Sequence, residues 1–128
     1  YRNHRKIVVI DNKVAYVGGF NVGKEYIGLD EKFGYWRDTH LRIQGSGILG
    51  LHLRFLLDWN YAAKENLFTN RKYFSKVYPG TRDKCLMQVI SSGPDTTRQM
   101  IHDNYLYYIQ CTLMSSILVC VILYIFYF

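Results

Sequence analysis

Two short apolar runs, separated by a turn, constrain the fold of this chain more than any other feature of its sequence. Residues 5–10 read Arg-Lys-Ile-Val-Val-Ile, and residues 14–17 read Val-Ala-Tyr-Val. Residues 11–13, Asp-Asn-Lys, are typical of tight turns, and two glycines at 18–19 end the second run. The pattern predicts a β-hairpin over residues 5–17.

A strand and a long helix are expected after the hairpin. Residues 39–43 alternate polar with apolar side chains, which predicts a strand, and Gly45-Ser46-Gly47 precedes a helix from Ile48 to Glu65 with Ser46 as its N-cap. The apolar stripe of this helix comprises Ile48, Leu51, Phe55, Trp59 and Ala62, whereas Arg54, Asp58 and Lys64 are expected to face water. We expect the stripe to pack on the sheet.

The remaining charged part of the chain predicts a linker and the start of a second unit. Residues 64–84 are charged, contain Pro79-Gly80 and indicate an exposed linker. Residues 86–90 predict a strand, and residues 91–95 a loop that starts a helix through about Tyr108. The mixture of strands and helices indicates the α/β class.

The charge balance favours anionic partners. Lys and Arg outnumber Asp and Glu by 16 to 10, which gives a net charge of +6. The three cysteines are Cys85, Cys111 and Cys120, without a CxxC pair, so we expect neither a disulfide framework nor a thiolate zinc site. No metal ion and no other cofactor are expected.

The end of the chain differs from the rest in composition, since every formal charge lies before residue 104. As a helix, residues 105–128 would be about 36 Å long, enough to span a bilayer. The alternatives for these residues are a buried strand and the out-of-frame product of a broken gene, and we favour the last. Their aromatic and β-branched composition would promote aggregation if they were exposed.

A spaced set of polar residues at the start of the chain indicates phosphate chemistry. The string is H-x-K-x4-D-x6-G-G-x-N, and its polar members are His4, Lys6, Asp11 and Asn21. The strand period of two puts His4 and Lys6 on one face. An imidazole can attack phosphorus or move a proton, and an ammonium neutralises the non-bridging oxygens. The paired glycines let the backbone approach a ligand, and the Asn21 amide can donate to it.

This string resembles the signature of the phospholipase D superfamily, and its surroundings resemble the bacterial cardiolipin synthases in particular. The resemblance covers about residues 2–109 and is carried by residues 3–11, 18–23, 35–45, 55–59 and 88–95. It implies a two-lobed enzyme in which each lobe is an α/β sandwich with one motif. On that basis, residues 1–83 are the C-terminal part of the first lobe, residues 84–109 begin the second lobe, and residues 110–128 form the hydrophobic tail. The amino-terminal part of the first lobe is expected to be missing.

The resemblance also implies a mechanism, the transfer of a phosphatidyl group between two phosphatidylglycerol molecules through a phosphohistidine. His4 would be the nucleophile or its acid/base partner, Lys6 and Asn21 would hold the phosphate, and Asp11 would brace the motif. Asp38 is the candidate to accept a hydrogen bond from the second nitrogen of His4. The alternative for Asp38 is an ion pair with Arg37 or Arg42.

Only one such motif is present, because His40, His52 and His102 lack a lysine two positions on, and we expect them to be non-catalytic. The isolated chain is therefore expected to be inactive without a second motif-bearing lobe or chain. The expected partners are phosphatidylglycerol and an anionic membrane surface, at the bacterial cell membrane, with no nucleic acid. Two alternatives stay open: a non-catalytic, membrane-associated remnant that binds anionic lipid, and a nuclease or phosphodiesterase of the same superfamily.

Overall fold

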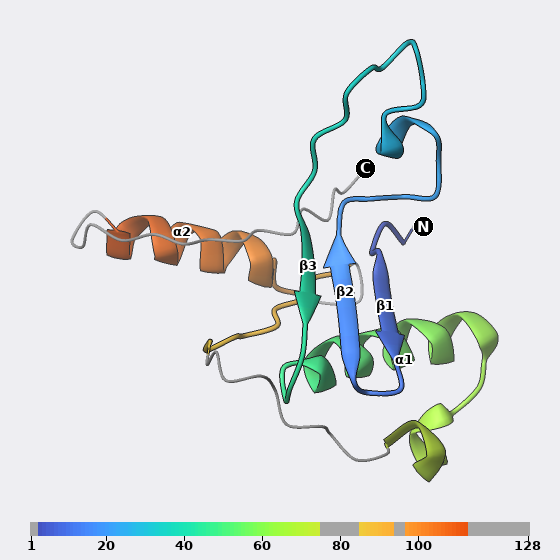
Figure 1. The fold of residues 1–128 in the computed structure, drawn as a ribbon. Helices are drawn as coiled ribbons and strands as arrows, with labels where there is room; N and C mark the ends of the chain where they lie inside the picture. The colour runs from blue at the N-terminus through green and yellow to red at the C-terminus, as the bar shows by residue number, and fades with distance from the viewer. Residues whose placement is uncertain (1–2, 75–84, 94–96, 113–128) are drawn as a thin grey trace.

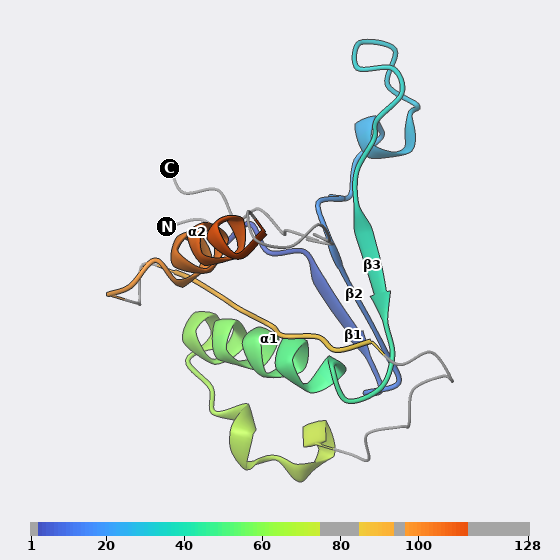
Figure 2. The same ribbon diagram turned by 90° about the vertical axis from the view of Figure 1, so that its left-hand side faces the viewer.

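The structure, a computed structural model, describes residues 3–74, 85–93 and 97–112. Within those ranges it combines an antiparallel sheet with helices on one side of it (Figures 1 and 2). The elements are β1 (Ile7–Ile10), β2 (Val14–Gly18), the 3-10 turn η1 (Glu25–Ile27), β3 (His40–Ile43), α1 (Ile48–Ala63), the 3-10 turns η2 (Leu67–Thr69) and η3 (Arg71–Phe74), and α2 (Met100–Thr112). The expected mixture of helices and strands is confirmed. The assignment to a phospholipase D-type lobe and the division at residues 83 and 109 stay predictions.

The sheet has the order β1-β2-β3 with antiparallel neighbours, so the predicted hairpin is confirmed. Lys13 N donates to Ile10 O at 2.9 Å, and the two residues between them, Asp11 and Asn12, have φ of 51° and 53°. Aspartate and asparagine tolerate this left-handed region better than most residues, and hairpin turns require it. The turn chemistry of the sequence therefore fixes this end of the hairpin.

One face of the sheet packs on α1. Ala15 and Val17 of β2 form the core with Ile48 and Leu51 of α1, and Ile7, Val9, Leu41 and Ile43 pack against this core. The alternating residues of β1, Val8 and Ile10, point to the opposite face and are about half exposed. Figure 2 shows α1 and α2 on the same side of the sheet, so that the opposite face is open among the described residues.

The start of α1 agrees with the sequence, but its cap does not. The helix begins at Ile48, as expected, and ends at Ala63, where Lys64 adopts a φ of 55°. Gly47 rather than Ser46 occupies the N-cap position, and no side chain caps it. The prediction of Ser46 as N-cap is therefore wrong; its backbone carbonyl accepts from Leu49 N instead.

The buried side of α1 is rotated from the predicted stripe. Ile48 and Leu51 are buried as expected, but the next buried residues are His52 and Leu56. Phe55 and Trp59 are 38% and 46% exposed. They stack on each other, with ring centroids 6.1 Å apart, beside the outer edge of β1, where the described residues supply no further strand to cover them.

The prediction that Arg54 and Asp58 face water is also wrong. Their side chains are only 14% and 18% exposed, because Asp58 binds Arg5 at the start of β1 and Arg54 binds Asp58. Lys64 is exposed, as expected, and so is Ala62, which the stripe had included.

The segment 85–93 forms no strand, which corrects the prediction for residues 86–90. It runs alongside α1, as Figure 2 shows, and its side chains contact the helix at its glycines. A Cβ on Gly50 would lie 2.8 Å from Val89 Cγ2, and one on Gly47 would clash with Met87 Cε. Helix packing thus takes the place of strand pairing here.

The remaining predictions are tested in part. Residues 64–74 form short turns and are mostly exposed, as expected of a linker, while residues 75–84 lie outside the described residues. The last helix, α2, starts later than expected, at Met100, and continues to Thr112. The interpretations of residues 113–128 lie outside the described residues. Among the helices of the described ranges, none has the length and apolarity needed to span a membrane.

Candidate active site

Three chain segments meet at one end of the sheet. Because the strands are antiparallel, the residues before β1, after β2 and before β3 share an end, the upper end in Figure 1. This end carries His4 and Lys6, the Gly18-Gly19-Phe20-Asn21 segment, Asp38 and His40. The fold therefore brings most of the predicted site residues to one region, from parts of the sequence more than thirty residues apart.

His4 and Lys6 point away from α1. The residue between them, Arg5, directs its side chain to Asp58 of α1, so in an extended chain its two neighbours face the open side. His4 is exposed and Lys6 is half-buried. The imidazole and the ammonium are thus both on the accessible face of the sheet, as a bound phosphate requires.

The structure does not bring Asp11 to His4. Asp11 lies in the β1–β2 turn at the other end of the hairpin, about 23 Å away along extended chain at 3.3 Å per residue. There it lines a hollow of about 450 Å³ together with Asn12 and His52. Asp11 has a positive φ in this turn, and its expected role as a brace of the motif stays a prediction.

Asn21 lies at the start of the long connection between β2 and β3. Its side chain is exposed, and Nδ2 donates to the hydroxyl of Tyr26 at 2.6 Å. Tyr26 packs edge-to-face against Phe20 and Trp36, with ring centroids 6.4 and 4.9 Å apart. This aromatic cluster fixes the loop that carries Asn21, whose amide has a second N–H besides the one that Tyr26 accepts.

Asp38 lies over the second glycine of the motif. A Cβ on Gly19 would lie 2.7 Å from Asp38 Cγ, so a larger residue there would require this carboxylate to move. Asp38 Oδ1 accepts a hydrogen bond from Thr39 N at 2.6 Å. Among the described residues, no hydrogen bond joins Asp38 to His4, and no ion pair joins it to Arg37 or Arg42.

His40 is the site neighbour that sequence reasoning missed. It pairs with Gly18 across β2 and β3, and the β1–β2 register, continued by one residue, places Lys6 opposite the same glycine. Its ring stacks on Phe20, with centroids 5.4 Å apart, over Gly18. His40 Nδ1 is buried, with no hydrogen-bond partner among the described residues.

The sequence could not place His40 near the motif because it does not show the register between β2 and β3. His40 is on a strand, as predicted, but the sequence does not show which residue of β2 it faces. A one-residue slip would have moved His40 to the α1 side. Its expected non-catalytic role stays a prediction.

The other two histidines lie elsewhere. His52 is buried in α1, where its ring stacks on Phe74 at 5.9 Å, and burial lowers its pKa below the usual value. His102 is exposed on α2, 3.5 Å from Asp103. Over the described ranges, no group of three His, Cys, Asp or Glu residues is arranged to hold a metal ion.

Comparison with known proteins connects this region to one enzyme family. No family model matches the chain, and no solved structure matches it. It is 55% identical over 106 residues to cardiolipin synthase 2 of Staphylococcus epidermidis, and 48% identical over 108 residues to the major cardiolipin synthase ClsA of Bacillus subtilis. The cardiolipin synthase of Oceanobacillus iheyensis is 46% identical over 106 residues.

These matches cover 82–83% of this chain but only 21–22% of each relative. The chain thus spans about a fifth of the length of the curated relatives it matches. Because several cardiolipin synthases agree with it at this level over most of its length, the chain belongs to the cardiolipin synthase family as a segment of that sequence.

Proposed function

We propose that this chain supplies one half of a phosphatidyltransferase site that forms cardiolipin and glycerol from two phosphatidylglycerol molecules. The observation that carries the proposal is that His4, Lys6 and Asn21 lie at the same end of the sheet, with Lys6 on its open face. It is the arrangement that a phosphate held between an imidazole and an ammonium needs.

In the proposed reaction, one histidine attacks the phosphorus of the first phosphatidylglycerol. A P–N bond forms while the P–O bond to glycerol breaks, and a second histidine protonates the leaving glycerol oxygen. That second histidine then removes the proton from the hydroxyl of another phosphatidylglycerol, whose oxygen attacks phosphorus and breaks the P–N bond. His4 is either the nucleophile or the acid/base partner, and the other histidine comes from a second motif-bearing lobe or chain.

Lys6 and Asn21 would stabilise the charge on the phosphate oxygens. Asp38 would orient His4 by accepting a hydrogen bond from its second nitrogen, which requires its carboxylate to turn from Thr39 N toward His4 when substrate binds. Asp11 would support the site through the hairpin turn alone.

The rim of the site supports a lipid substrate over nucleic acid. The connection between β2 and β3 extends beyond the sheet beside the site (Figure 1). It exposes the apolar side chains of Val22, Ile27, Leu29, Phe33 and Tyr35. Acyl chains fit such a rim, whereas a nucleic-acid backbone is bound chiefly by basic side chains. We accordingly place the active protein at the bacterial cell membrane, on an anionic surface rich in phosphatidylglycerol.

A chimaera tests the proposal. In it, residues 3–109 of this chain replace the matching segment of the Staphylococcus epidermidis relative, which supplies the rest of the protein. Labelled phosphatidylglycerol in mixed micelles should be converted to cardiolipin, and acid-labile phosphate should appear on histidine. Binding to phosphatidylglycerol vesicles without turnover would instead support the non-catalytic remnant, and hydrolysis of a nucleic acid would support the nuclease.

A further inference from the structure

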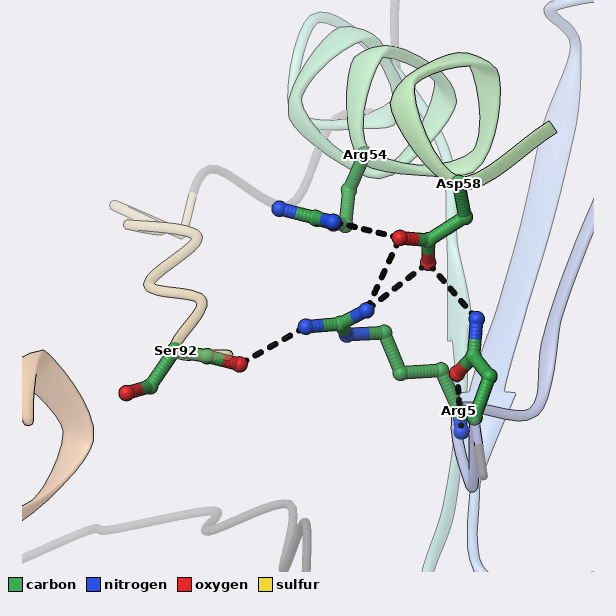
Figure 3. Close-up of polar contacts among 5 residues, drawn as sticks. Arg5, Arg54, Asp58 and Ser92 are labelled. Carbon is green, nitrogen blue, oxygen red and sulfur yellow. Dashed lines mark hydrogen bonds and ion pairs between the residues drawn. The ribbon is translucent and has the colours of Figure 1, made fainter. Parts of the chain in front are cut away.

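Both neighbours of His4 are held by one carboxylate of α1. Asn3 Nδ2 donates to Asp58 Oδ2 at 3.0 Å. Arg5 Nη1 donates to both oxygens of Asp58 at 2.9 Å, as Figure 3 shows. His4 lies between these two anchored residues, so the backbone that carries its imidazole is fixed on both sides.

The same residues are tied further. Asn3 Oδ1 accepts a hydrogen bond from Arg5 N at 3.0 Å, which closes a small ring of contacts around His4. Arg5 Nη2 donates to the backbone oxygen of Ser92 at 2.7 Å and so joins the segment 85–93 to the start of β1. Figure 3 shows the Arg5 guanidinium between Asp58 and Ser92.

The ion cluster of Arg5, Arg54 and Asp58 is shielded from water, and its hydrogen bonds join charged groups. The side chains of Arg5 and Asp58 are 5% and 18% exposed. Burial raises the pKa of Asp58, but hydrogen bonds from Arg54 and Asn3 and the charges of Arg5 and Arg54 outweigh it, so the net pKa is lower than usual. Hydrogen bonds between charged groups are stronger than neutral ones, and a shielded pair is little screened by salt.

His4 has no such anchor of its own. Its side chain is exposed, and no hydrogen bond of its ring occurs among the described residues. An imidazole that attacks phosphorus must be held near its productive geometry, and here the holding force reaches it only through the adjacent backbone.

We propose that Asp58 is a positioning residue for His4, which it fixes by binding Asn3 and Arg5 from behind the sheet. A buried ion pair is weak evidence for stability, and orientation is the better reason for this one. The catalytic consequence rests on the proposed phosphatidyl transfer, but the geometric claim does not.

The chain offers a matched control. Arg54 also donates to Asp58 Oδ1, but it comes from the same helix as Asp58, one turn earlier, whereas Asn3 and Arg5 come from the segment before β1. Asp58→Asn removes the charge that holds Asn3 and Arg5. Arg5→Lys keeps the charge but replaces the guanidinium fork, which reaches Asp58 through Nη1 and Ser92 through Nη2, by a single ammonium group. Arg54→Gln perturbs the cluster and leaves the anchors of His4 in place.

The first measurement needs no activity. NMR relaxation of the 128-residue chain reports the order parameter of the His4 backbone amide. This parameter is about 0.85 for rigid backbone and below about 0.6 for mobile backbone. We expect a rigid His4 in the wild type and in Arg54→Gln, and a mobile one in Asp58→Asn. An order parameter unchanged by Asp58→Asn would overturn the proposal.

The second measurement is made in the chimaera, with rates normalised to folded protein. We expect Asp58→Asn and Arg5→Lys to lower kcat about 10- to 100-fold with little change in KM, since a misplacement near 1 Å is worth that much. Arg54→Gln should leave kcat unchanged, and a fall equal to that of Asp58→Asn would reduce Asp58 to a structural role. If the wild-type chimaera made no cardiolipin, the proposed function would fail. The order parameters would still decide whether Asp58 fixes the backbone of His4.

Discussion

The imidazole of His40 lies over the backbone of Gly18, on the face of the sheet that carries Lys6. A Cβ built on Gly18 would lie 2.6 Å from His40 Cγ and 2.6 Å from the backbone oxygen of Thr39. Gly18 is therefore required by the close approach of β3, and it also leaves room for a histidine beside the proposed phosphate position. This motif glycine thus shapes the site through the packing of β3.

Gly18→Ala should destabilise the chain. The new methyl group meets the Thr39 backbone as well as a side chain, so a rotamer change of His40 alone does not relieve the clash. Overpacking of this kind raises the free energy of the native state by about 1–3 kcal/mol. Denaturant unfolding should show a lower midpoint for Gly18→Ala. Ser46→Ala is the control, because Ser46 is exposed and caps nothing, and it should change stability by less than about 0.5 kcal/mol.

Leu56→Ala should cost more stability than Trp59→Ala, in spite of the larger indole. Leu56 is 1% exposed and its truncation leaves a cavity, for which about 2–5 kcal/mol is typical. Trp59 is 46% exposed, so we expect about 2 kcal/mol or less. The free energies of unfolding of both variants, measured in the same denaturant, provide the test. The reverse order would restore the stripe that the sequence predicts.

The ion cluster at Asp58 should make stability depend on pH in the acid range. Its pKa in the folded chain is lower than the ordinary 3.8, so the unfolded chain binds more protons between the two values. The contribution of Asp58 is thus complete above about pH 3.8 and is lost as the pH falls through the folded pKa. The stability gap between wild type and Asp58→Asn should narrow over that range, and a constant gap would contradict the assignment.

His52 should make stability depend on pH nearer neutrality. Burial lowers the pKa of His52 from 6.5, so the folded chain binds its proton less well than the unfolded chain does. Stability is complete above about pH 6.5 and falls as the pH drops toward the lower, folded value. Titration of the unfolding free energy should show this slope in the wild type and a shallower one in His52→Gln.

Local patterns predicted the elements of this fold better than their relative placement. The hairpin and the start of α1 follow from periodicity and turn residues, which act over a few neighbours. The burial of Leu56 instead of Trp59 depends on which neighbours cover the helix, and the strand expected at 86–90 lacks a partner. Packing between distant segments decides both the buried side of α1 and the conformation of residues 86–90. Such contacts cannot be inferred from local patterns in a single sequence.

The candidate site shows the same division. The period of two put His4 and Lys6 on one face. The motif groups Asp11 with them along the chain, but the hairpin carries Asp11 to the other end of the sheet. His40 and Asp58 were undervalued for the opposite reason. Their proximity to the motif depends on a strand register and on a helix position, which spacing along the chain does not reveal.

The last prediction tests whether Lys6 stabilises charge at the site or is an ordinary surface lysine. In the chimaera, Lys6→Ala should lower kcat by about 10²–10³-fold, because it removes a cation from the oxygens on which charge develops. Lys72→Ala is the matched control, since Lys72 is an exposed lysine in the turn after α1, at the other end of the sheet, and it should leave kcat unchanged. His4→Ala should abolish turnover, because neither the nucleophile nor the acid/base role passes to another group.

The isolated 128-residue chain should form no cardiolipin, because it has no second motif to protonate the leaving glycerol oxygen, a step worth about 10²–10⁴-fold. Turnover by the isolated chain would instead indicate a site built from two copies of His4, and its rate would then rise with the square of the chain concentration at high dilution.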